Sequence, residues 1–367
     1  MNLNINKFQP VNLEDLGWDS FFRAHYKSLN IPDSVPARVI SESIDSLRVY
    51  CQYGELSAKI SGRMRYHAGE EYQYPAVGDW VVIKPLINEQ KGIISAVLPR
   101  KSKFSRKVAG ERTEEQIISA NIDTVFIISG LDGGRNFNLR RIERYLTLAW
   151  NSGATPVIVL NKIDLCPDVD IYISSVEGIA SGISIHPVSA KERIGLDLLE
   201  NYLSKGKTAA FLGSSGVGKS ALINALLGIE MQETREVRVD DRMGRHTTTR
   251  RELILLPSGG IVIDTPGLRE IQLWAGDDDL QSAFSDIEML AKQCRFRDCS
   301  HNVESGCAVK AAINEGNLDP ARLKSYWKLQ NELEYLASRE ENSPRLYEKL
   351  RWKKISKLSK QLKNDLR

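Results

Sequence analysis

The stretch TAAFLGSSGVGKSALINALLG, residues 208–228, decides the fold of the central part of this chain. It consists of an apolar run, the loop GSSGVGKS at Gly213–Ser220, and a segment typical of a helix. The loop fits the pattern G-x-x-x-x-G-K-[ST], with the strand before it and the helix after it that this pattern requires. Its backbone N–H groups hold a phosphate, Lys219 reaches the β and γ phosphates, and the Ser220 hydroxyl offers a ligand to Mg²⁺. The sequence therefore predicts a phosphate-binding α/β domain, with a chance loop as the alternative.

A second motif predicts which base the site reads. NKID, Asn161–Asp164, follows the apolar run TPVIVL, where such folds contact the base. The Asp164 carboxylate accepts two hydrogen bonds from guanine, whereas adenine lacks this pair of donors and would leave the carboxylate unpaired. We therefore expect GTP rather than ATP, with Asn161 and Lys162 bracing the loop and the ring. A surface turn is the alternative for so short a motif.

Two further strand ends carry motifs of the same kind. VSAK, at 188–191, follows the run ISIHP and resembles the loop whose backbone contacts the guanine carbonyl. DTPG, at 264–267, follows the run IVI, which predicts Asp264 near Mg²⁺ and the Gly267 amide near the γ-phosphate. The candidate nucleotide-contacting residues are Asn161, Lys162, Ile163, Asp164, Ser189, Ala190, Gly213, Ser214, Ser215, Gly216, Val217, Gly218, Lys219, Ser220, Ala221, Thr248, Asp264 and Gly267.

The segment GRHTTTR, at 244–250, suits a mobile switch. We expect its Thr248 hydroxyl, with Ser220, to complete the magnesium shell. The residue after DTPG is Leu268, where many GTPases place a glutamine that orients the attacking water. Because leucine cannot hydrogen-bond to water, we expect slow intrinsic hydrolysis, with His246 and Lys219 as the catalytic residues. A structural or solvent-facing histidine is the alternative for His246.

These motifs run in the order NKID, SAK, phosphate loop, switch threonine and DTPG, whereas the usual order begins at the phosphate loop. Circular permutation keeps a fold when the old termini lie close together at the surface. Apolar runs alternate with helical segments from about 115 to 285, which predicts βα units around a largely parallel sheet. We therefore expect a circularly permuted P-loop GTPase domain.

Two other domains are expected beside it. Short β-rich runs between about 35 and 105, separated by Gly, Pro and Asp, predict a small β-barrel of the OB type, with an SH3-like barrel as the alternative. The basic run PRKSKFSRK follows it and fits a phosphate backbone or a solvated linker equally well. The predicted parts are an N-terminal extension (1–34), the barrel (35–108), the GTPase domain (109–285), and a zinc-binding helical domain with a basic tail (286–367).

A metal site is predicted near the C-terminus. CRFRDCSHNVESGC places Cys294, Cys299, His301 and Cys307 in the spacing C-x4-C-x-H-x5-C. Three thiolates and an imidazole supply the closed tetrahedral shell that structural Zn²⁺ prefers, and they leave no open position for catalysis. Free buried cysteines are the alternative.

Charge and hydropathy bear on the partners and the location of the protein. The formal net charge is only +3, but basic residues crowd the tail: Arg345, Lys349, Arg351, Lys353, Lys354, Lys357, Lys360, Lys363 and Arg367. This run fits nucleic-acid contact or a solvated helix face. The sequence shows no apolar run of about 18 residues and no signal-peptide pattern at its start. We therefore expect a cytoplasmic monomer without membrane contact.

Taken together, the ordered motifs and the cysteine cluster resemble the bacterial ribosome small-subunit-dependent GTPase A family over about residues 35–340. The resemblance implies GTP hydrolysis stimulated by the 30S ribosomal subunit, contact with 16S rRNA, and a role in late small-subunit maturation. It departs from the family at Ser305, where a proline usually follows the glutamate of the zinc loop. Two alternatives stay open: a GTP-gated RNA-binding assembly scaffold with incidental hydrolysis, and a permuted GTPase that acts on a non-ribosomal protein.

Overall fold

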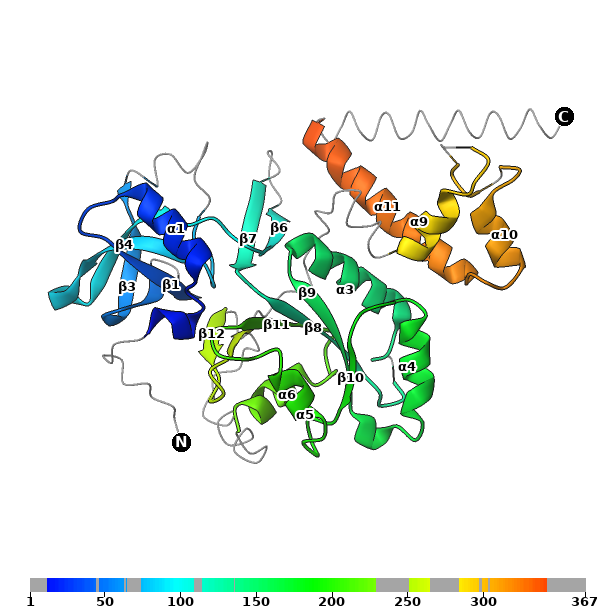
Figure 1. Cartoon of the computed structure of the whole chain (residues 1–367), viewed down its shortest axis with the longest axis horizontal. Helices are drawn as coiled ribbons and strands as arrows, with labels where there is room; N and C mark the ends of the chain where they lie inside the picture. The colour runs from blue at the N-terminus through cyan, green and yellow to red at the C-terminus, as the bar shows by residue number, and fades with distance from the viewer. Residues whose placement is uncertain are drawn as a thin grey trace, which may run out of the picture. The chain divides into compact units, whose positions relative to one another are not determined.

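A computed structural model describes residues 12–43, 46–62, 64, 74–108, 114–134, 136–228, 251–264, 284–296, 299–302 and 304–341 (Figure 1). The chain divides into two compact units, Met1–Arg106 with Gln116–Ile271, and Lys107–Glu115 with Gln272–Arg367. The first unit contains a β-barrel and an α/β domain, and the second contains the cysteine cluster and the helices around it.

A mostly parallel sheet forms the centre of the α/β domain. Its strands are β8 (Thr124–Gly130), β9 (Thr155–Asn161), β10 (Ile185–Val188), β11 (Thr208–Leu212), β12 (Glu252–Leu255) and β13 (Ile261–Asp264). They lie in the order β10-β9-β8-β11-β13-β12, and β12 runs antiparallel to β13 while the others run parallel to their neighbours. Strand β11, which leads into the phosphate loop, is central, although β8, β9 and β10 precede it in the chain. The circularly permuted α/β fold predicted from the motif order is confirmed.

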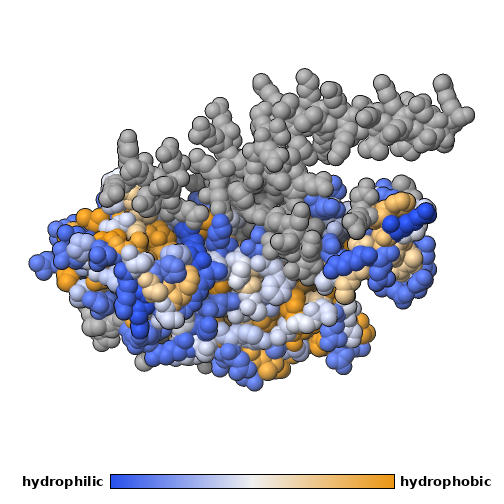
Figure 2. Space-filling view, turned by 45° about the horizontal axis from the view of Figure 1, so that its top comes forward, coloured by the Kyte–Doolittle hydropathy of each residue, from blue (hydrophilic) through white to orange (hydrophobic). Residues whose placement is uncertain are grey.

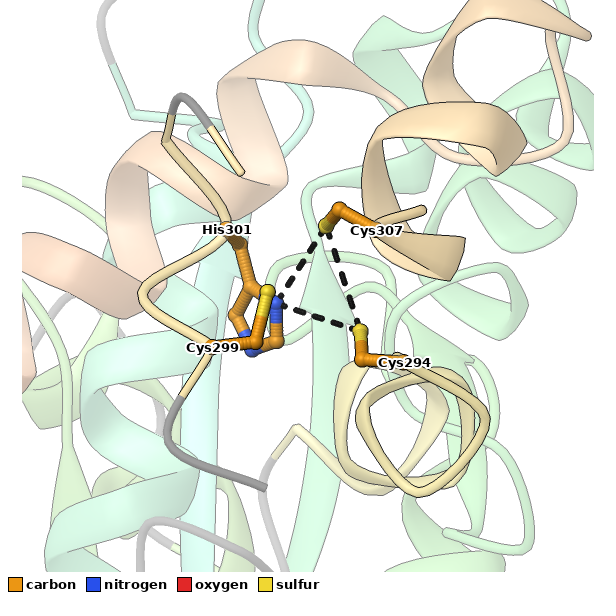
Figure 3. Close-up of side chains that lie close together, drawn as sticks. All are labelled: Cys294, Cys299, His301 and Cys307. Atoms are coloured by element: carbon orange, nitrogen blue, oxygen red, sulfur yellow. Dashed lines mark hydrogen bonds between the residues drawn. The ribbon is translucent and has the colours of Figure 1, made fainter. Parts of the chain in front are cut away.

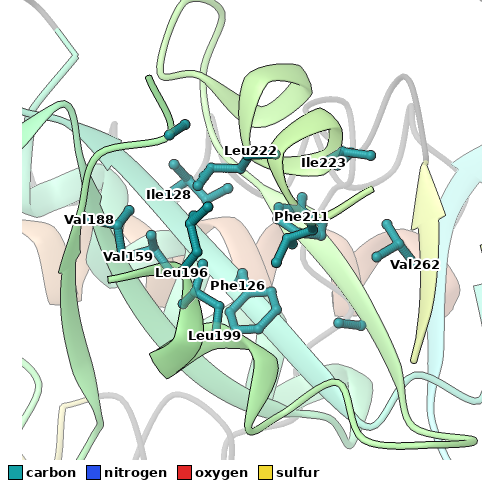
Figure 4. Close-up of a cluster of buried hydrophobic side chains, with 14 of the residues drawn as sticks. Phe126, Ile128, Val159, Val188, Leu196, Leu199, Phe211, Leu222, Ile223 and Val262 are labelled. Carbon is teal, nitrogen blue, oxygen red and sulfur yellow. The ribbon is translucent and has the colours of Figure 1, made fainter. Parts of the chain in front are cut away.

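Alternate residues of the central strands form an apolar layer under two helices. Phe126 and Phe211 lie on this face of β8 and β11, since successive strand residues point to opposite faces. Leu199 of helix α5 (Leu196–Glu200) and Leu222 of helix α6 (Lys219–Leu226) pack onto the same layer (Figure 4). Each fully buried side chain of this size contributes roughly 1.5–3 kcal/mol. The layer therefore fixes helix α6, and with it the phosphate loop, over the centre of the sheet.

The remaining helices of this domain follow strands β8 and β9. Helix α3 (Leu139–Ser152) contacts both strands; the Asn138 side chain caps its start, and Gly153 ends it. The short helix η3 (Ile163–Leu165) and helix α4 (Val169–Glu177) follow β9. Helix η3 begins directly after the strand, so the NKID motif lies at the strand end rather than inside a long loop.

The N-terminal part of the first unit contains a closed barrel. Its elements are β1 (Val35–Glu42), β2 (Leu47–Cys51), β3 (Gly54–Ile60), β4 (Trp80–Leu86), η2 (Ile87–Glu89) and β5 (Lys91–Val97). The strand order is β1-β2-β3-β5-β4, and pairing of β4 with β1 closes it. Buried Val39, Val49 and Ile94 pack inside. This closed five-stranded order confirms the predicted OB-type barrel.

A short N-terminal segment packs on the outside of the barrel. It forms helix η1 (Leu13–Leu16), a left-handed turn at Gly17, and helix α1 (Ser20–Leu29), which Asp19 caps. Leu16 and Trp18 both lie before α1, because the left-handed turn at Gly17 interrupts the chain there. Their side chains are nevertheless buried against Trp80 of the barrel.

A buried guanidinium connects the barrel to the α/β sheet. Arg38 of β1 is 1% exposed and donates hydrogen bonds to the backbone oxygens of Leu16, Gly78 (3.2 Å) and Asn121 (3.1 Å), and to Thr208 Oγ1 (2.9 Å). Burial lowers the pKa of Arg38 to about 10, so it stays charged at neutral pH. Strand β1 also pairs with β12, through Ser41 and Glu252. The barrel is therefore joined to the first residue of the strand that carries the phosphate loop.

The second unit is mainly helical. Its helices are α9 (Ser285–Ala291), α10 (Ala308–Asn314) and α11 (Pro320–Glu341). Arg322 of α11 is paired with Asp286 of α9 through two hydrogen bonds of 2.5 and 2.6 Å. Tyr326 packs on buried Phe284 and donates to Glu288. A two-stranded ribbon, β6 (Lys103–Val108) with β7 (Glu114–Ala120), follows the barrel in the chain.

The surface mixes hydrophilic residues with smaller hydrophobic areas, as Figure 2 shows for one face. In the part of the chain that the structure describes, no helix has both the length and the apolar character to cross a membrane.

Replacing Arg38 tests the junction between barrel and sheet. Arg38→Met removes four buried hydrogen bonds, to the backbone oxygens of Leu16, Gly78 and Asn121 and to the Thr208 hydroxyl, which costs on the order of 3 kcal/mol. We expect the thermal unfolding midpoint to fall by about 5–10 °C. Arg23→Met is the matched control, because Arg23 forms an exposed ion pair with Glu14. Equal midpoints for the two variants would show that the buried network does not stabilise the junction.

Candidate nucleotide site and metal cluster

The predicted base-reading, SAK and phosphate-loop motifs, with the first residue of DTPG, follow neighbouring parallel strands. The carboxyl ends of such strands lie at one edge of the sheet, where α/β proteins bind ligands. Asn161 ends β9, with Lys162, Ile163 and Asp164 directly after it; Ser189 and Ala190 follow β10; Gly213, Ser214, Ser215, Gly216, Val217 and Gly218 connect β11 to α6; Lys219, Ser220 and Ala221 begin α6; and Asp264 ends β13. The predicted residues at these four strand ends are therefore brought together by the sheet order.

The phosphate loop is accessible and its lysine is folded onto it. Ser215 and Ser220 are exposed, and Lys219 is half-buried. The Lys219 ammonium donates to the backbone oxygens of Gly213 (2.8 Å) and Ser214 (2.7 Å). These carbonyls hold the ammonium at the loop. It could exchange them for a bound phosphate with little movement of the chain.

The side chain of Asn161 holds three of these loops in register. Asn161 is 1% exposed; its Nδ2 donates to Val217 O of the phosphate loop at 2.8 Å, and its Oδ1 accepts from Ala190 N at 3.1 Å. Gly218 has φ +99°, and a Cβ at that position would lie 2.2 Å from Asn161 Nδ2. The loop therefore approaches Asn161 closely only because position 218 is glycine.

Asp164 lies at the same carboxyl edge of the sheet, just after β9. It is exposed, and its Oδ1 accepts from Ser189 Oγ at 2.6 Å. Ser189 Oγ also accepts from Glu192 N at 3.1 Å. The carboxylate of the NKID motif is thus oriented by the SAK loop.

Two contacts at the site were not foreseen from the motifs. Lys162 Nζ lies 2.5 Å from Asp132 Oδ2 in the segment after β8, and this ion pair lowers the pKa of Asp132. On helix α3, Arg141 donates to Ser214 Oγ of the phosphate loop at 2.7 Å. The signal for Asp132 was its place two residues after the apolar run DTVFIISG; it carries no motif of its own.

Asp264 ends β13, at the same edge of the sheet as the phosphate loop. The residue is exposed by area, yet enough atoms surround its carboxyl for desolvation to raise its pKa above the ordinary value, while the Lys219 charge acts against this rise. Thr248, His246, Gly267 and Leu268 lie outside the residues that the structure describes.

The second unit brings the four predicted metal ligands together. Their ligand atoms all lie within 4.8 Å of one another. The Cys294 and Cys307 sulfurs are 3.9 Å apart and lie 3.6 and 3.5 Å from His301 Nδ1 (Figure 3). A tetrahedron with zinc bonds of about 2.3 Å to sulfur and 2.0–2.1 Å to nitrogen has edges of roughly 3.8 and 3.6 Å. The cluster therefore has the size that a zinc ion requires.

The loop that carries two of these ligands is closed by Glu304. Its carboxylate accepts hydrogen bonds from the Ser300 hydroxyl and N–H and from the Asn302 N–H, at 2.5, 3.0 and 3.0 Å. These bonds, the Ser300 side chain first, lower the pKa of Glu304 to about 2. The loop is thus held by side-chain hydrogen bonds without a proline at Ser305.

A phosphate loop after the central strand β11, a base-reading motif at the end of β9 on the same sheet edge, and a permuted strand order define a circularly permuted P-loop GTPase. The comparisons with known proteins agree. A family model described as RsgA GTPase matches residues 97–274. The "Small ribosomal subunit biogenesis GTPase RsgA" of Opitutus terrae is 44% identical over 94% of this chain and 96% of its own length. The chain belongs to the RsgA GTPase family.

Two solved structures have the same fold. YjeQ from Thermotoga maritima matches with a TM-score of 0.60 and 29% identity, over 82% of this chain and 98% of its own. YloQ, described as a circularly permuted GTPase, matches with a TM-score of 0.57 and 23% identity, over 83% of this chain and 96% of its own. The GTPase activity and permuted fold predicted from the motifs are confirmed.

Replacing Gly218 tests the close approach of the phosphate loop to Asn161. We expect Gly218→Ala to weaken guanine-nucleotide binding at least about tenfold, because the added Cβ must displace the Asn161 amide. Gly228→Ala is the matched control: Gly228 also has positive φ (+72°), but a Cβ there meets none of the described residues within 4 Å. Titration with a fluorescent guanine nucleotide measures both. Equal affinity losses would mean that backbone strain, not the contact with Asn161, is responsible.

Proposed function

We propose that this GTPase acts on the small ribosomal subunit: the 30S subunit stimulates its GTP hydrolysis, and it assists late subunit maturation through contact with 16S rRNA. The observation that carries this proposal is the 44% identity, across nearly the whole chain, to a relative named for small ribosomal subunit biogenesis. The OB-type barrel is a fold that often binds nucleic acid, and the basic runs suit a phosphate backbone. We also propose that the protein is a cytoplasmic monomer.

Within the nucleotide site we propose the following roles. Asp164 accepts from the guanine edge, the amides of the phosphate loop and Lys219 hold the phosphates, and Ser220, Thr248 and Asp264 serve the magnesium ion. The observation behind this assignment is that Asn161 joins the NKID, SAK and phosphate loops. Magnesium, when bound, neutralises charge that develops on the phosphates. Gly267 would contact the γ-phosphate and His246 would orient the attacking water.

The first test is GTP turnover by the purified protein with and without 30S subunits. We expect strong stimulation by 30S subunits, no turnover of ATP, and a loss of at least about a hundredfold in Lys219→Ala, because removing one preorganised phosphate donor has costs of this size. His246→Ala should lower turnover with little change in GTP binding. Nucleotide binding without stimulation would instead favour the scaffold, or a non-ribosomal partner; salt-sensitive binding to 16S rRNA separates these two.

We propose that Cys294, Cys299, His301 and Cys307 hold one structural zinc ion. Zinc fits because the ligand atoms of Cys294, His301 and Cys307 stand at tetrahedral separations and that of Cys299 lies within 4.8 Å of them. A closed shell supplies folding free energy rather than catalysis. The ion would clamp the loop before α10 to the end of α9.

Metal analysis tests this site. We expect about one zinc ion per chain in the native protein and substantially less in Cys294→Ser, together with faster proteolysis of the second unit. Cys166→Ser is the control, because Cys166 is a half-buried cysteine of the first unit, outside the cluster. Undiminished zinc in Cys294→Ser, or an equal loss in both variants, would contradict the assignment.

A further inference from the structure

The segment after β8 lies against the NKID motif. Leu131 N donates to Asn161 O at 2.8 Å, which places the next residue, Asp132, beside Lys162. Asp132 Oδ2 accepts from Lys162 Nζ at 2.5 Å and from Asn136 Nδ2 at 2.8 Å. One carboxylate oxygen therefore receives both the lysine ammonium and a side-chain amide that comes from its own loop.

Asn136 is in turn packed against the phosphate loop. A Cβ built on Gly216 would lie 3.7 Å from Asn136 Nδ2, and one built on Gly130 would lie 3.1 Å from Asn136 Cβ and 3.5 Å from Val217 Cα. Ser129 Oγ also donates to Asn136 O at 3.1 Å. The amide that aligns the Asp132 carboxylate is thus itself fixed between the end of β8 and the phosphate loop.

The pairing restrains a side chain that would otherwise move freely. Lys162 has φ +68°, a left-handed backbone conformation, and its ammonium is paired with Asp132. A lysine has several rotatable bonds, and ordering it at the moment of binding reduces affinity. The Asp132 ion pair orders it before the nucleotide arrives.

Stability alone does not explain this arrangement. Within the described part of the chain, Asp132 Oδ1 is buried and has no hydrogen-bond partner. An unpaired buried acceptor is unfavourable for folding. Both side-chain donors, Lys162 and Asn136, go to Oδ2.

We propose that Asp132 is a positioning residue for guanine-nucleotide binding: it holds Lys162 where the lysine stem covers the face of the purine ring, and Asn136 aligns it. This inference rests on the nucleotide site proposed above. Asp132 acts through Lys162 and does not touch the nucleotide. Because a ring face is common to all purines, the contribution of Asp132 is the same for guanine and hypoxanthine nucleotides, whereas that of Asp164 depends on the base edge.

The experiment measures binding of GDP and of IDP, whose base lacks the 2-amino group, to the full chain. We expect Asp132→Asn to raise both dissociation constants about tenfold, with an unchanged GDP-to-IDP ratio, because a charge-assisted hydrogen bond is lost. The KM for GTP should rise similarly, while kcat at saturating GTP changes far less. Asp132→Glu, which keeps the charge, should recover part of the affinity. Asp197→Asn is the matched control, because Asp197 is exposed on helix α5.

Three results would overturn the proposal: wild-type affinity in Asp132→Asn, a changed GDP-to-IDP ratio in that variant, or an equal effect in Asp197→Asn. Asn136→Ala provides a second variant should Asp132→Asn not fold; it should weaken both nucleotides about threefold, and unchanged affinity would likewise count against the idea. Asp164→Asn separates the two levels of inference. If Asp164→Asn leaves the dissociation constant for GDP unchanged, the proposed nucleotide site itself is wrong. If Asp164→Asn weakens GDP binding but the Asp132 variants do not, only the positioning role of Asp132 is wrong.

Discussion

The loops at the carboxyl edge of this sheet depend on one buried amide. Asn161 donates to the phosphate loop and accepts from the SAK loop, so its carboxamide joins segments that follow β9, β10 and β11. Because the amide is buried, losing either partner would leave a polar group unsatisfied, which makes the arrangement cooperative. Ser189 then orients Asp164, and the segment after β8 orients Lys162. The permuted order of the motifs leaves these contacts unchanged, because the ends of parallel strands meet at one edge of the sheet whatever their order along the chain.

The permutation does change what the GTPase strands are joined to. The chain enters β8 after the barrel, and Arg38 links that barrel to Thr208, the first residue of the strand that ends in the phosphate loop. Strand β12 adds a second connection, through the pairing of its first residue, Glu252, with Ser41 of β1. The barrel and the nucleotide edge are thus parts of one compact unit, so whatever the barrel binds is held by the same body as the phosphate loop.

Much of the architecture was predictable because its signals are local. The phosphate loop, NKID and the cysteine cluster each lie within a short stretch, and their chemistry follows from residue type and spacing. The barrel followed from short β-rich runs between turn residues. The break at Gly17 is different: Leu16 and Trp18 pack from either side of a left-handed turn that periodicity alone does not reveal. Roles for His246, Thr248 and Gly267 stay predictions.

The sequence by itself determined the class of chemistry: guanine and phosphate recognition, a permuted motif order, and a closed set of metal ligands. Only the tertiary structure decided which residues support those motifs. Arg38 contacts Thr208 across 170 positions and Lys162 contacts Asp132 across 30, and neither pair lies in a recognisable pattern. The physical reason is that such contacts arise from the order of the strands in the sheet and from the need of buried polar groups for hydrogen-bond partners. Both are properties of the folded chain rather than of any local stretch of it.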